Sequence, residues 1–226
     1  GENLVVIGRI SSIFAFVVLF WALFDQIGTL WQIQARELDR TIPEWIPLIG
    51  GMEMLAAQVS AVWNPLFILL LIPTFSYCIY PLVGKFVEIT PLKRIGTGLW
   101  IMGLAFTVVS LLQQEVDAGH SPSVMWQVLA CFILTAAEIL VSITCLEFAY
   151  TQAPKSMKSF IMALFLLTVS LGNYLTSAVK FLIVDENGHS ILPGASEFWF
   201  WTALVCIAAF AFKFVASNYR EVDHFH

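Results

Sequence analysis

The apolar run LTAAEILVSITCLEFAYTQAP, residues 134–154, contains two carboxylates, Glu138 and Glu147. An ionised carboxylate at the centre of a bilayer costs about 2.5–3.5 kcal/mol on insertion scales, and it usually faces a cavity, a charged partner or a proton path. Ser142 follows Glu138 by one helical turn and shares its face, whereas Glu147 lies about 180° away around a regular helix. We therefore expect Glu138 to act in a cavity, and Glu147 to have a structural or gating role near the headgroups.

A second acidic face lies in the run FVVLFWALFDQIGTLWQIQ, residues 16–34. Steps of four and three residues place Val17, Trp21, Asp25, Gly28 and Gln32 along one side of a helix, with Asp25 as the charged centre. Trp21 can line a cavity or stack on a cationic ligand, although an aromatic residue in a membrane helix is more often a packing or interface residue. Asp25 is therefore a candidate for gating or proton coupling.

Asn64 precedes Pro65 in the apolar segment WNPLF and brings hydrogen-bond donors and an acceptor to membrane depth. Its amide can contact a polar ligand, or it can form an ordinary bond between two helices. Pro65 and Pro73 each remove an intrahelical hydrogen bond, so a bend is expected at both positions. Bent helices suit a moving gate, but prolines also occur in membrane helices that have no such role.

Cations are absent from the interiors of the apolar runs, since every lysine and arginine flanks a run or lies within about a turn of its end. No histidine lies within a run. Burial disfavours the charged form of a carboxylate, so Asp25 and Glu138 must be protonated, receive a cation from another segment, or bind a cationic ligand. A proton-coupled transporter needs these three states.

The composition excludes several classes of function. With 59% hydrophobic residues, 12% charged residues and a mean hydropathy of +0.83, the chain is a membrane protein. Its net charge of −5 offers no basic surface for nucleic acid. The sequence contains no HExxH, GxSxG, Walker or GxGxxG motif, and Gly96-Thr97-Gly98 is more simply explained by close helix packing. We expect neither an enzyme nor a cofactor, and no metal site, because the four cysteines lack metal-ligand spacing.

Six apolar segments reach the roughly 20 residues needed to cross a bilayer. Their limits are 11–33, 59–83, 95–113, 124–149, 159–183 and 196–217. The predicted fold is an all-α membrane protein, a six-transmembrane-helix bundle at 11–217 with a lead-in at 1–10 and a tail at 218–226. The longest loop, about 34–58, is expected at the outer membrane interface. No signal-peptide pattern is present, and because the chain does not begin with Met we expect an earlier portion to exist.

The distribution of cations predicts the orientation of the bundle. An even number of spans puts both ends of the chain on one side of the membrane. That side carries eight cations: Arg9, Lys85, Lys93, Arg94, Lys155, Lys158, Lys213 and Arg220. The other side carries three: Arg36, Arg40 and Lys180. By the positive-inside rule, both termini are expected in the cytoplasm.

Several motifs together resemble a known family. The runs FWALFDQIGTLW, NPLFILLLIP, EILVSITCLEFAYTQAPKSMKSF and LLTVSLGN are similar, in this order, to the second half of proton-coupled oligopeptide transporters of the major facilitator superfamily. The resemblance extends from Arg9 to about Arg220 and corresponds to helices seven to twelve, which implies one half of a major facilitator fold. The short loop near Gly119 resembles bacterial members, which implies a multi-pass protein of the bacterial inner (plasma) membrane.

The resemblance also implies roles for individual residues. Glu138 matches the glutamate that receives the amino terminus of the peptide, and Ser142 matches the serine one turn below it. Asn64 matches the asparagine beside that amino group, and Trp21 matches a tryptophan of the pocket. Asp25 matches the acidic position that pairs with a fourth-helix lysine to close the outer gate, and that lysine would lie in the other half of the transporter.

Two positions depart from the pattern of the family. Phe165 occupies a place where many relatives carry a pocket tryptophan, so the hydrogen bond of an indole is missing and side-chain preference is expected to differ. Asp25 is one methylene shorter than the glutamate of some relatives. The residues of the first half that couple the proton and bind the peptide carboxylate are not in this sequence.

The resulting hypothesis is a proton-coupled symporter of di- and tripeptides that works by alternating access. This chain would supply the C-terminal bundle that binds the peptide amino terminus, and its partners would be the peptide, protons, the lipid bilayer and an N-terminal six-helix bundle. One alternative keeps the fold and changes the cargo to nitrate or another small solute, although Glu138 would repel an anion unless protonated. A second alternative is a non-transporting, truncated membrane subunit.

Overall fold

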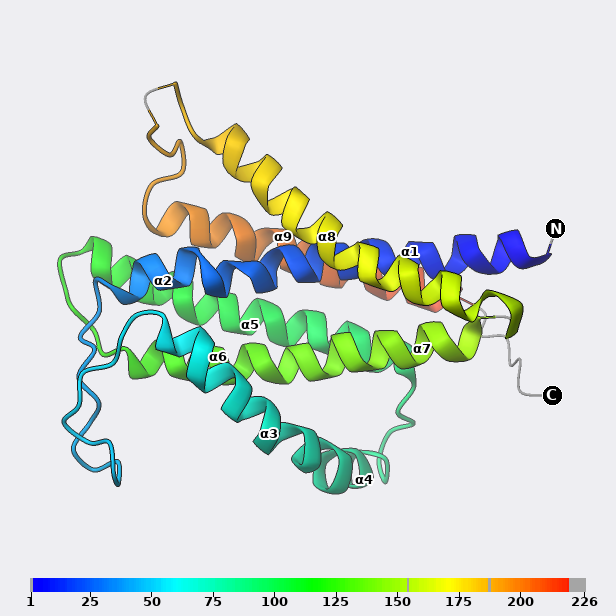
Figure 1. Ribbon diagram of the computed structural model, residues 1–226, viewed down its shortest axis with the longest axis horizontal. Helices are drawn as coiled ribbons and strands as arrows, with labels where there is room; N and C mark the ends of the chain where they lie inside the picture. The colour runs from blue at the N-terminus through cyan, green and yellow to red at the C-terminus, as the bar shows by residue number, and fades with distance from the viewer. Residues whose placement is uncertain (1, 154, 187, 220–226) are drawn as a thin grey trace.

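The computed structural model describes residues 2–153, 155–186 and 188–219 (Figure 1). Within these residues six stretches are long and apolar enough to cross a membrane, and we number them spans one to six. They are Ile7–Ala35, Val59–Val83, Pro91–Asp117, Met125–Gln152, Lys155–Ile183 and Ala195–Asn218. The predicted all-α fold with six membrane helices is confirmed, and the predicted limits agree with these stretches to within four residues at each end.

Spans one, two and four are interrupted helices. Span one consists of α1 (Glu2–Phe24), a 3-10 turn (Asp25–Gly28) and α2 (Leu30–Ala35). Span two consists of a π turn (Val59–Trp63), α3 (Asn64–Thr74), a second π turn (Phe75–Ile79) and α4 (Tyr80–Val83). Span four consists of α6 (Met125–Glu138), a π turn (Ile139–Ile143) and α7 (Thr144–Gln152).

The remaining spans are continuous α-helices. Span three is α5 (Pro91–Asp117), span five is a 3-10 turn (Lys155–Met157) followed by α8 (Lys158–Ile183), and span six is α9 (Ala195–Asn218). The start of α5 follows a standard pattern, because the Thr90 hydroxyl accepts a bond from the Lys93 amide (3.3 Å) and Pro91 occupies the first turn, where no amide hydrogen is needed.

The ends of the chain were predicted as a lead-in and a tail. The lead-in predicted at 1–10 is helical from Glu2 onward, because ENLVVIGRIS contains no proline and a single glycine, and nothing stops the helix before Ser11. The predicted tail at 218–226 lies outside the described residues from residue 220 onward.

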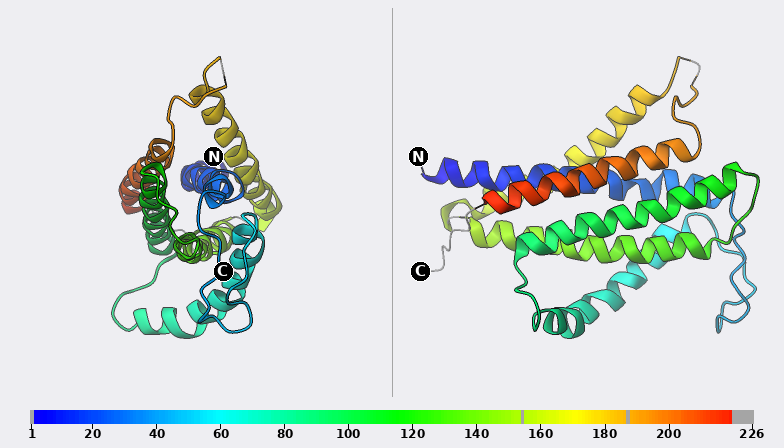
Figure 2. Two further views of the ribbon diagram at one scale, coloured as in Figure 1. Left: turned by 90° about the vertical axis from the view of Figure 1, so that its left-hand side faces the viewer. Right: turned by 180° about the vertical axis from the view of Figure 1, so that it is seen from behind.

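The core is formed by α1, α5, α6, α7 and α9. Helix α5 packs against α6 and α9, and α1 packs against α8 and α9. The end-on view in Figure 2 shows α1 enclosed by these neighbours. Trp31 and Phe106 meet edge to face with ring centroids 5.6 Å apart, and both side chains are fully buried. Aromatic pairs in this geometry add to the stability that apolar packing provides.

Glycine allows the closest helix contacts. A Cβ at Gly98 of α5 would lie 2.5 Å from Val141 and 3.1 Å from Leu140 of span four. A Cβ at Gly172 of α8 would lie 2.6 Å from the Cβ of Trp21 in α1. Such contacts between small residues and a neighbouring backbone are typical of membrane helices. The close packing predicted for residues 96–98 is thus present at Gly98.

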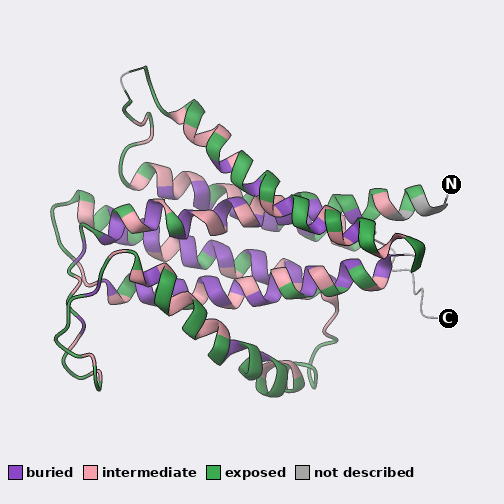
Figure 3. Cartoon of the chain, in the orientation of Figure 1, coloured by how far each residue is buried: buried purple, intermediate pink, exposed green. Residues whose placement is uncertain are grey.

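Span two leans away from the core. Only 11% of the residues in its apolar window are buried, against 61% in span four. Figure 1 shows α3 and α4 running obliquely away from α7, and Figure 3 shows most of their residues exposed. Proline explains part of this course, because Pro65 follows one π turn and Pro73 precedes the other, and prolines and π turns both bend helices.

The long loop between α2 and the first π turn is held by backbone bonds. The amide of Asp39 donates to the carbonyl of Pro122 (3.0 Å), and the amide of Val124 donates to the carbonyl of Asp39 (2.8 Å). The amide of Thr41 also donates to Asp39 Oδ1 (3.0 Å), and this bond holds the pKa of the Asp39 carboxyl below its ordinary value. Arg40 and Glu53 form an ion pair across the loop (2.6 Å).

Candidate functional site

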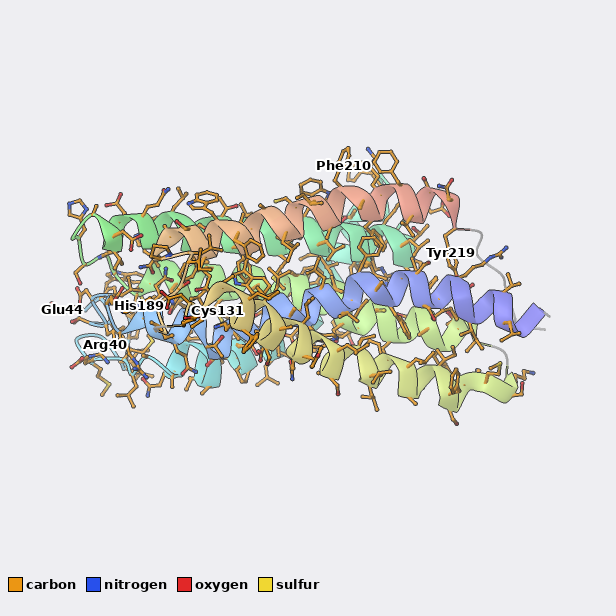
Figure 4. The ribbon with its side chains drawn as sticks, turned by 90° about the horizontal axis from the view of Figure 1, so that it is seen from above. Arg40, Glu44, Cys131, His189, Phe210 and Tyr219 are labelled. Atoms are coloured by element: carbon orange, nitrogen blue, oxygen red, sulfur yellow. The ribbon has the colours of Figure 1, made fainter. Side chains whose placement is uncertain are left out.

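Asn64 and Glu138 meet between spans two and four. Asn64 Nδ2 donates one hydrogen bond to Glu138 Oε2 (3.2 Å) and one to Thr135 Oγ1 (2.9 Å). The Thr135 hydroxyl in turn donates to the carbonyl of Cys131 (2.7 Å), so one face of α6 presents a continuous polar stripe to α3. Cys131 lies in the interior of the bundle (Figure 4), and its thiol contacts the Val59 carbonyl at 3.5 Å. Both Asn64 and Glu138 are half-buried, so the pair remains accessible.

Three of the charged or amide residues singled out from the sequence lie beside an irregular turn. Asp25 begins the 3-10 turn of span one, Asn64 directly follows a π turn, and Glu138 directly precedes another. Turns of this kind interrupt the regular backbone ladder, and they occur often at functional sites. The sequence predicted bends only from the prolines, and those lie in span two.

Asp25 is half-buried and has no ion pair within 4 Å among the described residues. The same holds for Glu138. The ion pairs in that part of the chain are Arg40–Glu53, Arg94–Glu147, His120–Glu115 and His189–Asp185. No group of three or more His, Cys, Asp or Glu residues within the described ranges is arranged to hold a metal ion. Among the residues that the structure describes, neither site carboxylate therefore has a cation close enough to form an ion pair.

Trp21 and Phe165 have different surroundings. Trp21 is half-buried, packs edge-on against Phe20 and Phe24, and has no described hydrogen-bond partner for its buried Nε1. Phe165 is only 7% exposed and meets Phe14 edge to face at 6.1 Å. Phe165 is thus a packing residue in this structure, whereas Trp21 has an indole N–H that is free for another partner.

Ser142 lies inside the π turn of span four and is half-buried. The placement of Ser142 and Glu147 relative to Glu138 was predicted for a regular helix. A π turn has more residues per turn than an α-helix, so the expected offset of about 180° between the two carboxylates does not apply across it. The two carboxylates nevertheless face different neighbours, since Glu138 contacts span two and Glu147 contacts span three.

Glu147 is exposed and pairs with Arg94 of α5 at 3.8 Å. The Arg94 guanidinium also lies over the ring of Tyr80, 4.4 Å from its centroid, which is a cation–π geometry. Arg94 thus joins spans two, three and four near the end of the bundle where α5 begins. Sequence reasoning assigned Arg94 only to the flanking cations, because helical periodicity does not show which neighbour a flanking residue meets.

A buried glutamine network at the opposite end was also missed. Gln34 Nε2 donates to Gln113 Oε1 (3.0 Å) and to the carbonyl of Val109 (2.9 Å), and Gln127 Nε2 donates to Gln34 Oε1 (2.9 Å). Gln113 continues the chain to Asp117 Oδ1 (3.0 Å). These three glutamines join spans one, three and four, and the signal for them was the presence of amides inside or beside apolar runs.

The fold and the site define a multi-pass, α-helical membrane protein with two half-buried carboxylates that have no ion-pair partner in the described part of the chain. The family model described as "PTR2: POT family" matches residues 3–195, and the chain belongs to this family.

Relatives and solved structures agree with this assignment. The chain is 28% identical to "Protein NRT1/ PTR FAMILY 8.3" of Arabidopsis thaliana over 97% of its length and 41% of the relative, and 27% identical to "Peptide transporter PTR2" of Saccharomyces cerevisiae over 95% and 37%. It is similar to an auto-inhibited POT family peptide transporter (34% identity, TM-score 0.83, 99% of this chain and 43% of the other). A second similar structure is the POT family transporter PepTSo (33% identity, TM-score 0.84, 99% and 44%). The chain spans about two fifths of the length of these proteins.

Proposed function

We propose that this chain is the C-terminal six-helix bundle of a bacterial proton-coupled transporter of di- and tripeptides, and that it binds the amino terminus of the peptide. The observation that carries the proposal is the pairing of Asn64 with Glu138 between spans two and four, with no cation within 4 Å of Glu138 in the described residues. The names of the yeast relative and of the similar structures, which are peptide transporters, support the same cargo.

A peptide ammonium satisfies what the site lacks. Glu138 has a negative charge available and Asn64 has an amide oxygen available, because the asparagine uses its nitrogen for the bonds to Glu138 and Thr135. A primary ammonium has three donors and no acceptor, so it can bond to both groups at once. Without peptide, a proton on Glu138 removes the cost of an uncompensated charge. The exchange of this proton for the peptide ammonium couples proton transport to peptide transport.

The site is completed, in this proposal, by an N-terminal six-helix bundle. Two facts support it: the chain spans about two fifths of its relatives, and span two has few residues buried against the rest of the chain. A cation supplied by the other bundle would pair with Asp25 and close an outer gate. Trp21, with its unpartnered indole, would line the side-chain space, and Ser142 would lie below the ammonium. Phe165 contributes only if a movement exposes it.

The proposed membrane position follows from the flanking cations. The end of the bundle that holds Arg9, Lys93 and Lys213 would face the cytoplasm of a bacterial cell, with both termini on that side. Glu138 lies near the middle of span four, and Asn64 reaches it from the second turn of span two. Transporters of the alternating-access type bind their cargo near the middle of the membrane.

The test uses the complete transporter, reconstituted into vesicles with an inward proton gradient. Glu138→Gln should abolish gradient-driven uptake of dialanine, because the amide can neither exchange a proton nor attract an ammonium. Glu44→Gln, in the exposed outer loop (Figure 4), is the matched control and should transport as the unmodified protein does. Full gradient-driven uptake by Glu138→Gln would overturn the assignment.

A second measurement isolates recognition of the ammonium. N-acetyl-dialanine has the same backbone and no amino terminus, so it should compete poorly with dialanine in the unmodified protein. If the acetylated peptide competes as well as dialanine, Glu138 does not bind the amino end, whatever its part in proton coupling.

The alternative cargo, nitrate, is decided by competition. The Arabidopsis relative is named "NRT1/ PTR FAMILY", so the names of similar proteins do not all refer to peptide transport alone. Inhibition of dialanine uptake by nitrate at lower concentration than by a second dipeptide would replace the peptide proposal. Reconstituting residues 1–226 alone tests the need for another bundle, and proton-linked uptake by this chain without a partner would refute that part of the proposal.

A further inference from the structure

A cavity of about 850 Å³ lies away from the Asn64–Glu138 pair, at the end of the bundle where α5 begins and α9 ends. Its walls come from the second π turn and α4 of span two, from the connection between α4 and α5, from α5 and α9, and from Leu140 of span four. Figure 1 shows α4 standing apart from α7 at this end, joined to α5 by an extended connection, and Figure 4 places Tyr219 there at the end of α9.

The walls of this cavity are mostly apolar. They include Phe75, Val83, Trp100, Ile101 and Phe212, from three different spans. Trp100 is 49% exposed and Val83 is 42% exposed, so apolar surface stays uncovered within the fold. A cavity of about 850 Å³ with apolar walls can hold hydrocarbon chains and offers few hydrogen bonds to a polar solute.

The charged residues of the cavity lie at one rim. Lys93 and Arg94 occupy the first turn of α5, and Lys213 lies in the last turns of α9. Glu88 is the carboxylate at this rim, and Lys93 Nζ donates to its backbone carbonyl (3.0 Å) rather than to its side chain. Three cations against one carboxylate leave the rim positive, although Arg94 is partly committed to Glu147 at 3.8 Å.

The Arg94 side chain adds a second sign of an absent partner. Its Nε is buried and has no hydrogen-bond partner among the described residues. Buried donors of charged groups are normally satisfied, and the planar guanidinium suits the oxygens of a phosphate. The distance of 3.8 Å between the Arg94 guanidinium and the Glu147 carboxylate is longer than a hydrogen bond, so Glu147 does not satisfy the donors of Arg94.

We propose that this cavity binds an anionic phospholipid, with the phosphate on Lys93, Arg94 and Lys213 and an acyl chain along the apolar wall. Positive charge at one rim and hydrocarbon surface beyond it match the two parts of such a lipid, whereas free phosphate would leave the wall uncovered. Basic pockets between membrane helices are known to hold anionic headgroups. The inference is independent of the transported cargo.

Native mass spectrometry tests this proposal directly. The complete protein is titrated with phosphatidylglycerol in one series and with phosphatidylcholine in another. Phosphatidylglycerol should bind more tightly. The double variant Lys93→Gln/Lys213→Gln should weaken its binding by about 25-fold, taking about fivefold for each basic residue near an anionic headgroup. The control Arg9→Gln/Lys155→Gln removes the same charge at the same end, outside the cavity, and should leave binding unchanged.

Two further arms separate the other occupants. Inorganic phosphate in large excess should not displace the lipid, and displacement would identify a soluble anion instead. A photo-crosslinking residue at Thr97, which lines the cavity and is exposed, should yield an adduct with the mass of the phospholipid in a phosphatidylglycerol bilayer. A crosslinked adduct with polypeptide would show that a protein segment fills the cavity. If both double variants lost the same amount of phosphatidylglycerol binding, the effect would come from general surface charge. Either result overturns the proposal without bearing on peptide uptake.

Discussion

Replacing Gly172 with alanine should force spans one and five apart where α1 and α8 cross. The new Cβ would lie 2.6 Å from the Cβ of Trp21 and 2.9 Å from both the Ala22 nitrogen and the Val18 oxygen. Carbon atoms in contact prefer about 3.5–4.0 Å. The methyl group is therefore about 1 Å too close to the Trp21 Cβ, and backbone atoms cannot rotate away as the end of a side chain can.

The size of the effect follows from two opposing terms. Adding a methyl group to a packed contact costs about 1–3 kcal/mol, and contact with backbone belongs at the upper end of that range. Alanine regains about 1 kcal/mol over glycine inside a helix. The expected net loss is about 2 kcal/mol, and a chain of this size then loses about 4–8 °C of melting temperature. Separation of the helices would also lengthen the bond from Thr176 Oγ1 to the Ala22 carbonyl (3.0 Å).

Thermal unfolding in detergent, followed by circular dichroism at the helix band, measures the shift. Gly8→Ala is the matched control, because a Cβ at Gly8 of α1 meets no other heavy atom within 4 Å. That variant should melt at the temperature of the unmodified protein or slightly above it. If Gly172→Ala also melts at or above that temperature, the close crossing at Trp21 is not a constraint on the fold and the reasoning fails.

Asn64→Ala and Thr135→Val should show a coupling of about 0.6–1.7 kcal/mol in a double-mutant cycle of unfolding, and additive costs would contradict the 2.9 Å bond between them. Gln113→Ala should cost about 1–3 kcal/mol by leaving buried amides unpaired, whereas its exposed neighbour Gln114→Ala should stay within about 0.5 kcal/mol. Equal melting temperatures of the two would refute the glutamine network. The pKa of Asp39 is lowered in the fold, so the carboxylate stabilises its loop above the ordinary value of 3.8, and this stability is lost as the pH falls through the lowered folded pKa. Pepsin should cut the loop faster as the pH falls through that range, and Asp39→Asn should remove this pH dependence.

Much of the fold could be predicted because it depends on local sequence. Lengths of apolar runs determine where a chain can cross a membrane, so the six spans were located without any tertiary information. The polar stripe of α6 is also a local property of the sequence, since one-turn spacing puts Thr135 and Glu138 on one face. Its contact with Asn64 of span two was implied only by the resemblance to known transporters.

The parts that could not be predicted depend on how each span is rotated about its axis and on where its regular backbone hydrogen bonds are interrupted. Nothing in ILVSI distinguishes a π turn from an α-helix, because the run contains no proline or glycine that would mark a break in the helix. The partner of Glu147 required the rotation of span three, which brings Arg94 to it. The assignment of Phe165 to a pocket came from its position in a motif and stays a prediction, and its contact with Phe14 could not be predicted from sequence.

Span two connects the two carboxylates of span four. At one level it carries Asn64, which bonds to Glu138 at 3.2 Å, and about four turns later it carries Tyr80, which stacks on Arg94, the partner of Glu147. The same span has the smallest buried share and contains two π turns, so it is the element whose displacement breaks the fewest apolar contacts. A change of charge at Glu138 alters its bond to span two. We propose that it thereby biases the Tyr80–Arg94–Glu147 contacts at the other level of span two.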